Sequence, residues 1–319
     1  MAAHAWQCPE ADRLVEESIR AIGAEIDALR VPKLFGVVLG GGYARGEGGV
    51  TDGNRLYNDL DFYVVADETS RAVDIERIAA ALRPVSKKWT ATLGVDVDFS
   101  PPKTPWRIRH DEERLMIQEL VHGYCDVAGR PGTELFADVA RRPPETLPLM
   151  EAVRLLVNRG AGLLMAAEAA GDPARRGFFA RNVNKVVLGC GDASLIARGS
   201  YRWKAEERAA ALGDGLYSRA VQWKFRPRPE PPCDWETARK LWLDACDEQE
   251  NLPWFDEPTG RRSLRAAARW IVRRRSLGPA PFRTTGLDPL VRILDAMYGL
   301  VRDRKPFAPS LRRDWEVFN

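Results

Sequence analysis

The chain has 319 residues, which is long enough for one large domain or for two of ordinary size. Its 48 basic and 45 acidic residues give a net charge of +3, too balanced to indicate nucleic acid, and no window approaches the roughly 18 apolar residues of a membrane span. The five cysteines are scattered and the N-terminus has no basic region before an apolar core, so we expect a cytoplasmic protein without a disulfide framework, structural zinc, a signal peptide or a membrane span.

The first half of the chain alternates between helical and strand periodicity. Apolar residues at near-helical spacing predict a first helix, and short apolar runs predict strands. Pro32 ends the first helix and Pro84 is expected to end the second. The predicted strands are 34–39, 60–65, 95–99 and 124–128, and the predicted helices are 11–30, 73–82 and 112–121.

The character of the sequence changes after the Pro-rich stretch 141–144, which indicates a boundary. Helical periodicity dominates from there, and the predicted helices are 150–170, 182–197, 235–248, 263–275 and 287–301. We therefore predict an α/β (α+β) domain over residues 1–145, with a small mixed sheet flanked by helices, followed by an all-helical domain over residues 146–319.

A glycine turn is the first candidate functional element. The apolar run 34–39 ends in Gly40, Gly41 and Gly42, whose bare backbone N–H groups can bind phosphate. No Gly-Lys-Ser/Thr follows, so the turn is not a P-loop, and Arg45 stands where a dinucleotide-binding pattern needs its third glycine. A purely structural tight turn is the alternative. The stretch 48–54 that follows is predicted to be a flexible loop beside the site.

Paired aspartates form the second candidate element. Asp59 and Asp61 are two residues apart on a strand, so they point to the same face about 7 Å apart, within reach of two metal ions about 3.5–4 Å apart. The next strand supplies Asp98, or Asp96 as the alternative. Such a cluster repels itself without cations, and ligands that are all oxygen favour Mg²⁺. An Asp-x-Asp pair alone is also common at an exposed strand end. The combination of the glycine turn, the pair on the second strand and an acid on the third favours a metal site.

The order of these motifs over residues 30–100 resembles the nucleotidyltransferase superfamily that includes DNA polymerase β. Within it, the chain is most similar to the minimal and the aminoglycoside-type antibiotic nucleotidyltransferases, and so the resemblance implies a nucleotidyltransferase fold for residues 1–145. It implies that Gly41 and Gly42 bind the β- and γ-phosphates of a nucleoside triphosphate. The family usually has serine where this chain has Gly42.

The resemblance also implies the reaction. Asp59 and Asp61 would carry two Mg²⁺ ions, and Asp98, with Asp96 as the alternative, would hold metal near the attacking hydroxyl. A substrate oxygen would attack the α-phosphorus, pyrophosphate would leave, and a nucleoside monophosphate would be transferred. ATP is the expected donor, although no motif in the chain reads the base.

Two basic residues are candidate phosphate contacts. Arg45 either binds phosphate or pairs with Glu47 or another acid as a scaffold. Lys185 lies in an otherwise apolar helix, so it needs an acidic partner or access to solvent. In the antibiotic-modifying relatives a helix of the second domain delivers such a lysine to the triphosphate, with a glutamate base one turn earlier. Arg181 occupies that position here, so the base is not carried over.

The expected partners are the nucleoside triphosphate and a small molecule with a hydroxyl group. Transfer of AMP to a protein, as in toxin–antitoxin systems, is the alternative, and a catalytically inactive nucleotide-binding module is the third. The resemblance also allows a homodimer. Nucleic acid is not expected, although four arginines form a stripe at helical spacing: Arg262, Arg265, Arg269 and Arg273.

Overall fold

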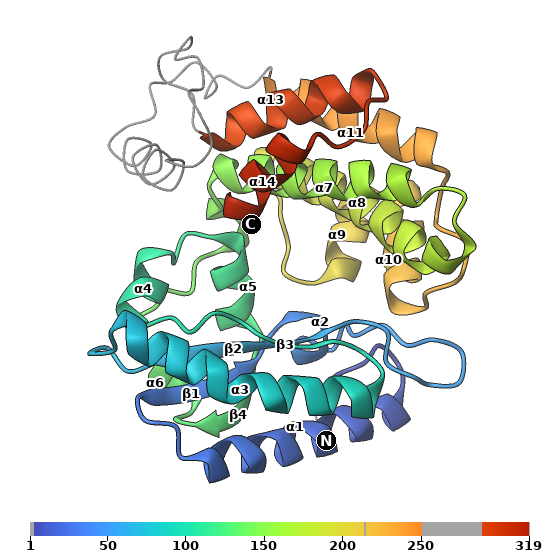
Figure 1. Cartoon of the computed structure of the whole chain (residues 1–319). Helices are drawn as coiled ribbons and strands as arrows, with labels where there is room; N and C mark the ends of the chain where they lie inside the picture. The colour runs from blue at the N-terminus through green and yellow to red at the C-terminus, as the bar shows by residue number, and fades with distance from the viewer. Residues whose placement is uncertain (1–2, 214, 251–288, 319) are drawn as a thin grey trace. The chain divides into compact units, whose positions relative to one another are not determined.

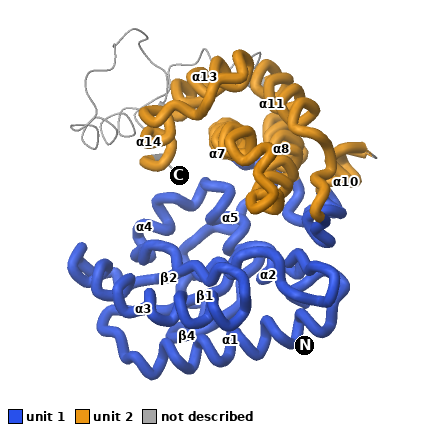
Figure 2. Tube along the Cα trace, turned by 45° about the vertical axis from the view of Figure 1, so that its right-hand side comes forward, with its two compact units in different colours: residues 1–147, 202–207, 221–228 blue, residues 148–201, 208–220, 229–319 orange. Residues whose placement is uncertain are grey.

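The computed structural model describes residues 3–213, 215–250 and 289–318. They form two compact units (Figure 2): unit 1 contains residues 1–147, 202–207 and 221–228, and unit 2 contains the rest. The first unit thus takes two short segments from the part of the chain that the sequence assigned to the second domain. The predicted helix 263–275 and its arginine stripe lie outside the described residues. None of the described helices is long and apolar enough to cross a membrane.

A four-stranded mixed sheet forms the centre of unit 1 (Figure 1). Its strands are β1 (Leu34–Leu39), β2 (Leu60–Ala66), β3 (Val97–Phe99) and β4 (Cys125–Gly129), in the order β3-β2-β1-β4. β1 is antiparallel to β2 and β4, whereas β2 and β3 are parallel. A parallel pair needs a crossover, and helix α3 (Ala72–Leu93) provides it. The small mixed sheet predicted from the sequence is confirmed.

Helices pack on both faces of this sheet, because alternate residues of each strand point to opposite faces. Helices α1 (Pro9–Leu29) and α3 share one core with Val37 and Leu39 of β1. Val38 belongs to a second core, which includes residues of α4 (Pro105–His110), α5 (Leu115–His122) and α6 (Gly132–Leu135). The short helix α2 (Gly41–Ala44) directly follows β1, and a 3₁₀ turn, η1 (Pro144–Thr146), lies near the end of the first long segment of the unit.

The expected end of the second helix at Pro84 is wrong, because α3 continues through Pro84 to Leu93. Pro84 costs one backbone hydrogen bond, but the apolar stripe of the helix continues beyond it. Val85 is buried, and Trp89 and Leu93 pack against the core. Burial of this second half therefore outweighs the local cost of the proline.

Helix α4 was not predicted, although its start carries a recognisable signal. The Thr104 hydroxyl accepts a hydrogen bond from the Arg107 backbone N–H, and Pro105 occupies the first helical position. Both are typical of a helix N-terminus. The helix predicted over 112–121 is shorter than expected and begins at Leu115.

Unit 2 is helical, as predicted for the C-terminal region. Helices α7 and α8 pack along each other, and α11 and α13 pack against them. The indole of Trp242 is fully buried, and its N–H donates to the Leu156 carbonyl over 2.9 Å. The elements are α7 (Leu149–Ala169), η2 (Pro173–Arg175), α8 (Arg176–Ala197), α11 (Trp235–Glu250), α13 (Pro289–Arg302) and α14 (Pro309–Phe318), together with α9 (Ala205–Leu212) and α10 (Leu216–Phe225), which contribute to both units.

A buried polar cluster holds α8, α9 and α10 together within unit 2. The side chain of Arg208 is 6% exposed, and its Nε lies 2.9 Å from Asp192 Oδ1. The same nitrogen donates to the Tyr217 hydroxyl over 3.0 Å, and that hydroxyl donates to Asp192 over 2.5 Å. The guanidinium also lies over the ring of Tyr201, 4.9 Å from its centre. Asp192 and Tyr201 therefore contribute to helix packing.

Candidate functional site

The glycine turn lies directly against the first predicted acid strand. The Gly40 N–H donates to the Asp61 carbonyl over 2.8 Å. Gly41 has φ +68°, a left-handed conformation that favours glycine, and a Cβ built there would lie 2.6 Å from Asp61 Oδ2. The backbone at Gly41 can therefore approach the Asp61 carboxylate only because it carries no side chain.

The acids of β2 and β3 lie in register. Asp61 pairs with Asp98 in the parallel ladder, where neighbouring strands are about 4.8 Å apart, and both side chains are exposed. Asp59 immediately precedes β2, and Asp96 precedes β3, where its carbonyl accepts the Leu60 N–H over 2.8 Å. The pairing thus places Asp98, and not Asp96, opposite Asp61.

Like charges act on Asp98. Partial removal from solvent, followed by the negative charges of Asp59 and Asp96, raises the pKa of the Asp98 carboxyl above its usual range. Within the described ranges, no three Asp, Glu, His or Cys side chains are arranged closely enough to hold a metal ion as they stand. Clustered carboxylates repel one another, and a bound divalent cation would offset that repulsion. The donor set of carboxylate oxygens is the one that Mg²⁺ prefers.

Arg45 adopts the scaffold role that the sequence left open. It ends α2, and its guanidinium lies 4.0 Å from Glu47 and 3.7 Å from Glu119. Glu47 also binds Lys224 Nζ at 2.6 Å and accepts the Ala205 backbone N–H over 2.7 Å. Glu47 therefore ties two distant segments of the chain to the glycine turn. A phosphate contact by Arg45 stays a prediction.

Lys224 is a basic residue beside the glycine turn that the sequence did not reveal. It lies 177 positions from Glu47 in the chain, and no local pattern links the two. Lys185, the lysine expected to reach the triphosphate, lies at an exposed position of α8 in unit 2. Its phosphate contact stays a prediction, as does the role of Gly42, where an added Cβ would lie 3.2 Å from the Glu47 carbonyl oxygen.

No family model matches this chain, and no solved structure matches it at a significant level. The functional conclusion therefore rests on the residues of this site and on their geometry. Those residues are the glycine turn, the acids of β2 and β3, and the side chains that hold the turn in place.

Tyr43 fixes the turn that follows α2. Its hydroxyl donates to the Gly49 carbonyl over 2.7 Å and accepts the Tyr57 N–H over 3.0 Å. Gly48, Gly49 and Val50 are buried, and the Asn58 side chain accepts the Gly49 N–H over 2.7 Å. The flexible loop predicted over 48–54 is therefore wrong for its first three residues, because buried backbone groups there are hydrogen-bonded.

Replacing Tyr43 with phenylalanine should lower the free energy of unfolding by about 1–3 kcal/mol, since both hydrogen bonds of a fully buried hydroxyl are lost. Urea denaturation measures the effect. The Tyr124→Phe variant is the matched control, because the Tyr124 hydroxyl has no hydrogen bond among the described residues. It should change stability by about 0.5 kcal/mol or less. Equal effects of the two variants would contradict the role given to Tyr43.

His4 contacts the backbone of helix α2 through its imidazole ring. Its ring is 1% exposed, with Nδ1 3.0 Å from the Tyr43 carbonyl oxygen and Nε2 3.0 Å from Glu16. The Cys125 sulfur, then Glu16 and the Tyr43 carbonyl, raise the pKa of His4 to about 9, against the opposing effect of burial. The protonated ring is thus the form that holds the α2 backbone.

Stability should fall as pH rises through the folded pKa of His4. The stabilisation is fully present below the unfolded pKa of 6.5 and is lost near pH 9, with a total of about 2–3 kcal/mol. Urea denaturation at pH 6, 7.5 and 9.5 measures it. The His4→Gln variant should lose this part of the pH dependence, whereas His110→Gln, at an exposed position, should keep it. Parallel pH profiles for wild type and His4→Gln would refute the assignment.

Proposed function

We propose that the chain is a Mg²⁺-dependent nucleotidyltransferase, which transfers a nucleoside monophosphate from a nucleoside triphosphate to a hydroxyl of a small molecule. One observation carries the proposal: the bare glycine turn touches Asp61, and Asp61 lies in register with Asp98. A glycine turn and a set of carboxylates are thus adjacent within a single unit. ATP is the expected donor.

Each group of residues has a defined role in this proposal. The backbone N–H groups of Gly41 and Gly42 bind the β- and γ-phosphates and orient the triphosphate. Asp59, Asp61 and Asp98 would hold Mg²⁺, which when bound neutralises charge on the attacking and leaving oxygens. Asp98, on the edge strand β3, would hold metal near the acceptor hydroxyl that attacks the α-phosphorus.

Supporting residues keep the turn in the conformation that this role requires. The ion pairs around Glu47 and the hydrogen bonds of Tyr43 hold residues 45–50, which directly follow α2. Positioning of the phosphates before reaction is a large part of catalysis in phosphoryl and nucleotidyl transfer. In this proposal the backbone of the turn binds the phosphates, while the side chains of Asp61 and Asp98 are exposed and accessible to Mg²⁺.

Calorimetric titration of the four nucleoside triphosphates, with and without Mg²⁺, tests the proposal. Wild type should bind one of them only with Mg²⁺, and the Asp59→Ala/Asp61→Ala double variant should lose at least about tenfold in affinity. Asp138→Ala is the matched control, because this acid is 72% exposed and pairs with Arg109 in the same unit. Circular dichroism checks that the wild-type protein is folded. If the folded protein binds none of the four nucleoside triphosphates, the proposal is overturned.

A further inference from the structure

A groove of about 910 Å³ runs along unit 1 between α3 and the segment that follows β3. Its floor is apolar and includes Ile75, Leu82 and Phe99. Trp106 also lines it, is 56% exposed, and stacks on His110 with ring centres 5.2 Å apart. An exposed indole beside an apolar floor suits the flat face of a ring.

The charged residues of the groove favour an anion. Four basic and three acidic residues line it, and one of the acids is Asp98. Lys103 lies 3.6 Å from Asp111, outside the groove. Arg83 and Arg107 form no ion pair among the described residues, so their guanidinium groups are available to a ligand. Guanidinium groups bind phosphate and carboxylate through paired hydrogen bonds.

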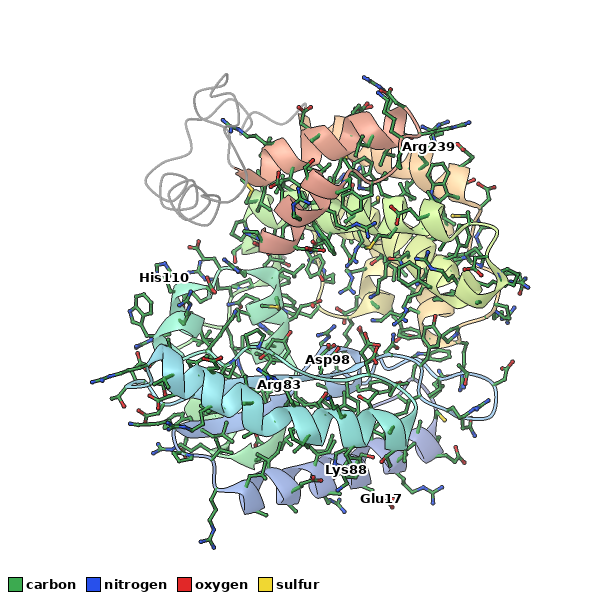
Figure 3. The ribbon with its side chains drawn as sticks, in the orientation of Figure 1. Glu17, Arg83, Lys88, Asp98, His110 and Arg239 are labelled. Carbon is green, nitrogen blue, oxygen red and sulfur yellow. The ribbon has the colours of Figure 1, made fainter. Side chains whose placement is uncertain are left out.

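The groove reaches one acid of the proposed reaction centre, Asp98. Asp98 and Arg83 both line it, one from β3 and the other from α3, and Figure 3 labels both side chains. A molecule held at Arg83 and Arg107 can therefore place another of its groups at Asp98. All of these residues belong to unit 1.

We propose that this groove is the acceptor site, and that the acceptor is a hydroxyl-bearing small molecule with a ring or apolar body and an anionic group. The reaction rests on the proposed function, whereas binding of the anion does not. In the transfer, the acceptor oxygen forms a bond to the α-phosphorus as the bond to the bridging oxygen breaks. Pyrophosphate leaves with that electron pair, and the hydroxyl proton is released to solvent.

Ligand-observed NMR on the full chain tests the groove without any reaction. The probes are phenyl phosphate, benzyl alcohol and benzylamine, which share a ring and differ in charge. Phenyl phosphate should bind best, and Arg83→Ala and Arg107→Ala should each weaken it about tenfold. Arg77→Ala is the control, because Arg77 is on the same helix but pairs with Asp74 and does not line the groove.

Three results of this experiment would overturn the proposal. They are the absence of phenyl phosphate binding at millimolar concentration, equal binding of benzylamine, and no effect of Arg83→Ala and Arg107→Ala. Displacement of phenyl phosphate by Mg²⁺ and the bound nucleoside triphosphate would also overturn it, since the groove would then belong to the nucleotide.

A transfer assay separates the acceptor site from the reaction itself. A nucleoside triphosphate labelled at the α-phosphate is incubated with sugar phosphates and hydroxy acids, and separately with amino sugars. Label should pass only to the anionic panel, and Arg83→Ala should raise KM for the acceptor about tenfold with kcat unchanged. Anion binding without transfer to any acceptor would sink the proposed function and leave the groove as an anion site. Transfer to amino sugars alone would support the proposed function and would overturn the groove as the site of an anionic acceptor.

Discussion

Replacing Asp98 with asparagine should leave affinity for the nucleoside triphosphate within about threefold of wild type and slow transfer about 10³-fold. The amide would keep the shape of the side chain but remove the negative charge that holds metal near the attacking hydroxyl. Asp59 and Asp61 would still bind Mg²⁺ and the nucleoside triphosphate. Stability should not fall, because burial and two neighbouring acids already disfavour the charged form of Asp98. Calorimetry measures binding, and pyrophosphate release in a single turnover measures transfer with a hydroxyl compound that wild type accepts.

Asp96→Asn is the matched control for this experiment, since both residues are exposed aspartates near the same strand. Asp96 is not paired with Asp61 in the sheet, so its replacement should change transfer less than about threefold. A large loss of transfer in Asp96→Asn together with an active Asp98→Asn would make Asp96 the third acid, contrary to the register of β2 and β3.

Removing Arg208 should cost unit 2 about 3–5 kcal/mol, a large part of the stability of an ordinary domain. Arg208→Ala would leave the Asp192 carboxylate, which is 15% exposed, beside Tyr217 without its cation. Urea denaturation followed by far-UV circular dichroism measures the loss. Arg198→Ala is the comparison, because Arg198 is 60% exposed and its ion pair with Glu248 should contribute about 1 kcal/mol or less.

A second variant keeps this prediction informative if Arg208→Ala does not fold. Asp192→Asn combined with Arg208→Met removes both charges and keeps most of the volume, so it should recover a large part of the lost stability. A double variant no more stable than Arg208→Ala would show that shape, and not the buried charge, decides stability at this cluster.

Local sequence patterns were enough to predict many of the helices and strands. The strand predicted over 34–39 is β1, because a run of apolar residues between a proline and three glycines has no helical alternative of sufficient length. The pair Asp59 and Asp61 was also found from its spacing, but only Asp61 lies on β2, and Asp59 immediately precedes the strand, so their shared face stays a prediction. The helical character of the second half followed from its periodicity.

Structural features that depend on contacts between residues far apart in the chain could not be predicted from the sequence. The contact between Glu47 and Lys224 joins residues far apart in sequence, and neither position carries a local signal. The register that sets Asp98 opposite Asp61 depends on how the crossover helix delivers β3, which spacing does not determine. Helix α3 passes Pro84 because core packing outweighs local propensity, and propensity is all that a single sequence shows.

Crystals grown with Mn²⁺ and a non-hydrolysable nucleoside triphosphate analogue test the central claim most directly. Anomalous diffraction should show two ions about 3.5–4 Å apart, ligated by Asp59, Asp61 and Asp98, with the phosphates on the N–H groups of the glycine turn. Analogue bound elsewhere, or manganese absent from these three carboxylates while the analogue is bound, would contradict the claim that they form the metal site of a nucleotidyltransferase.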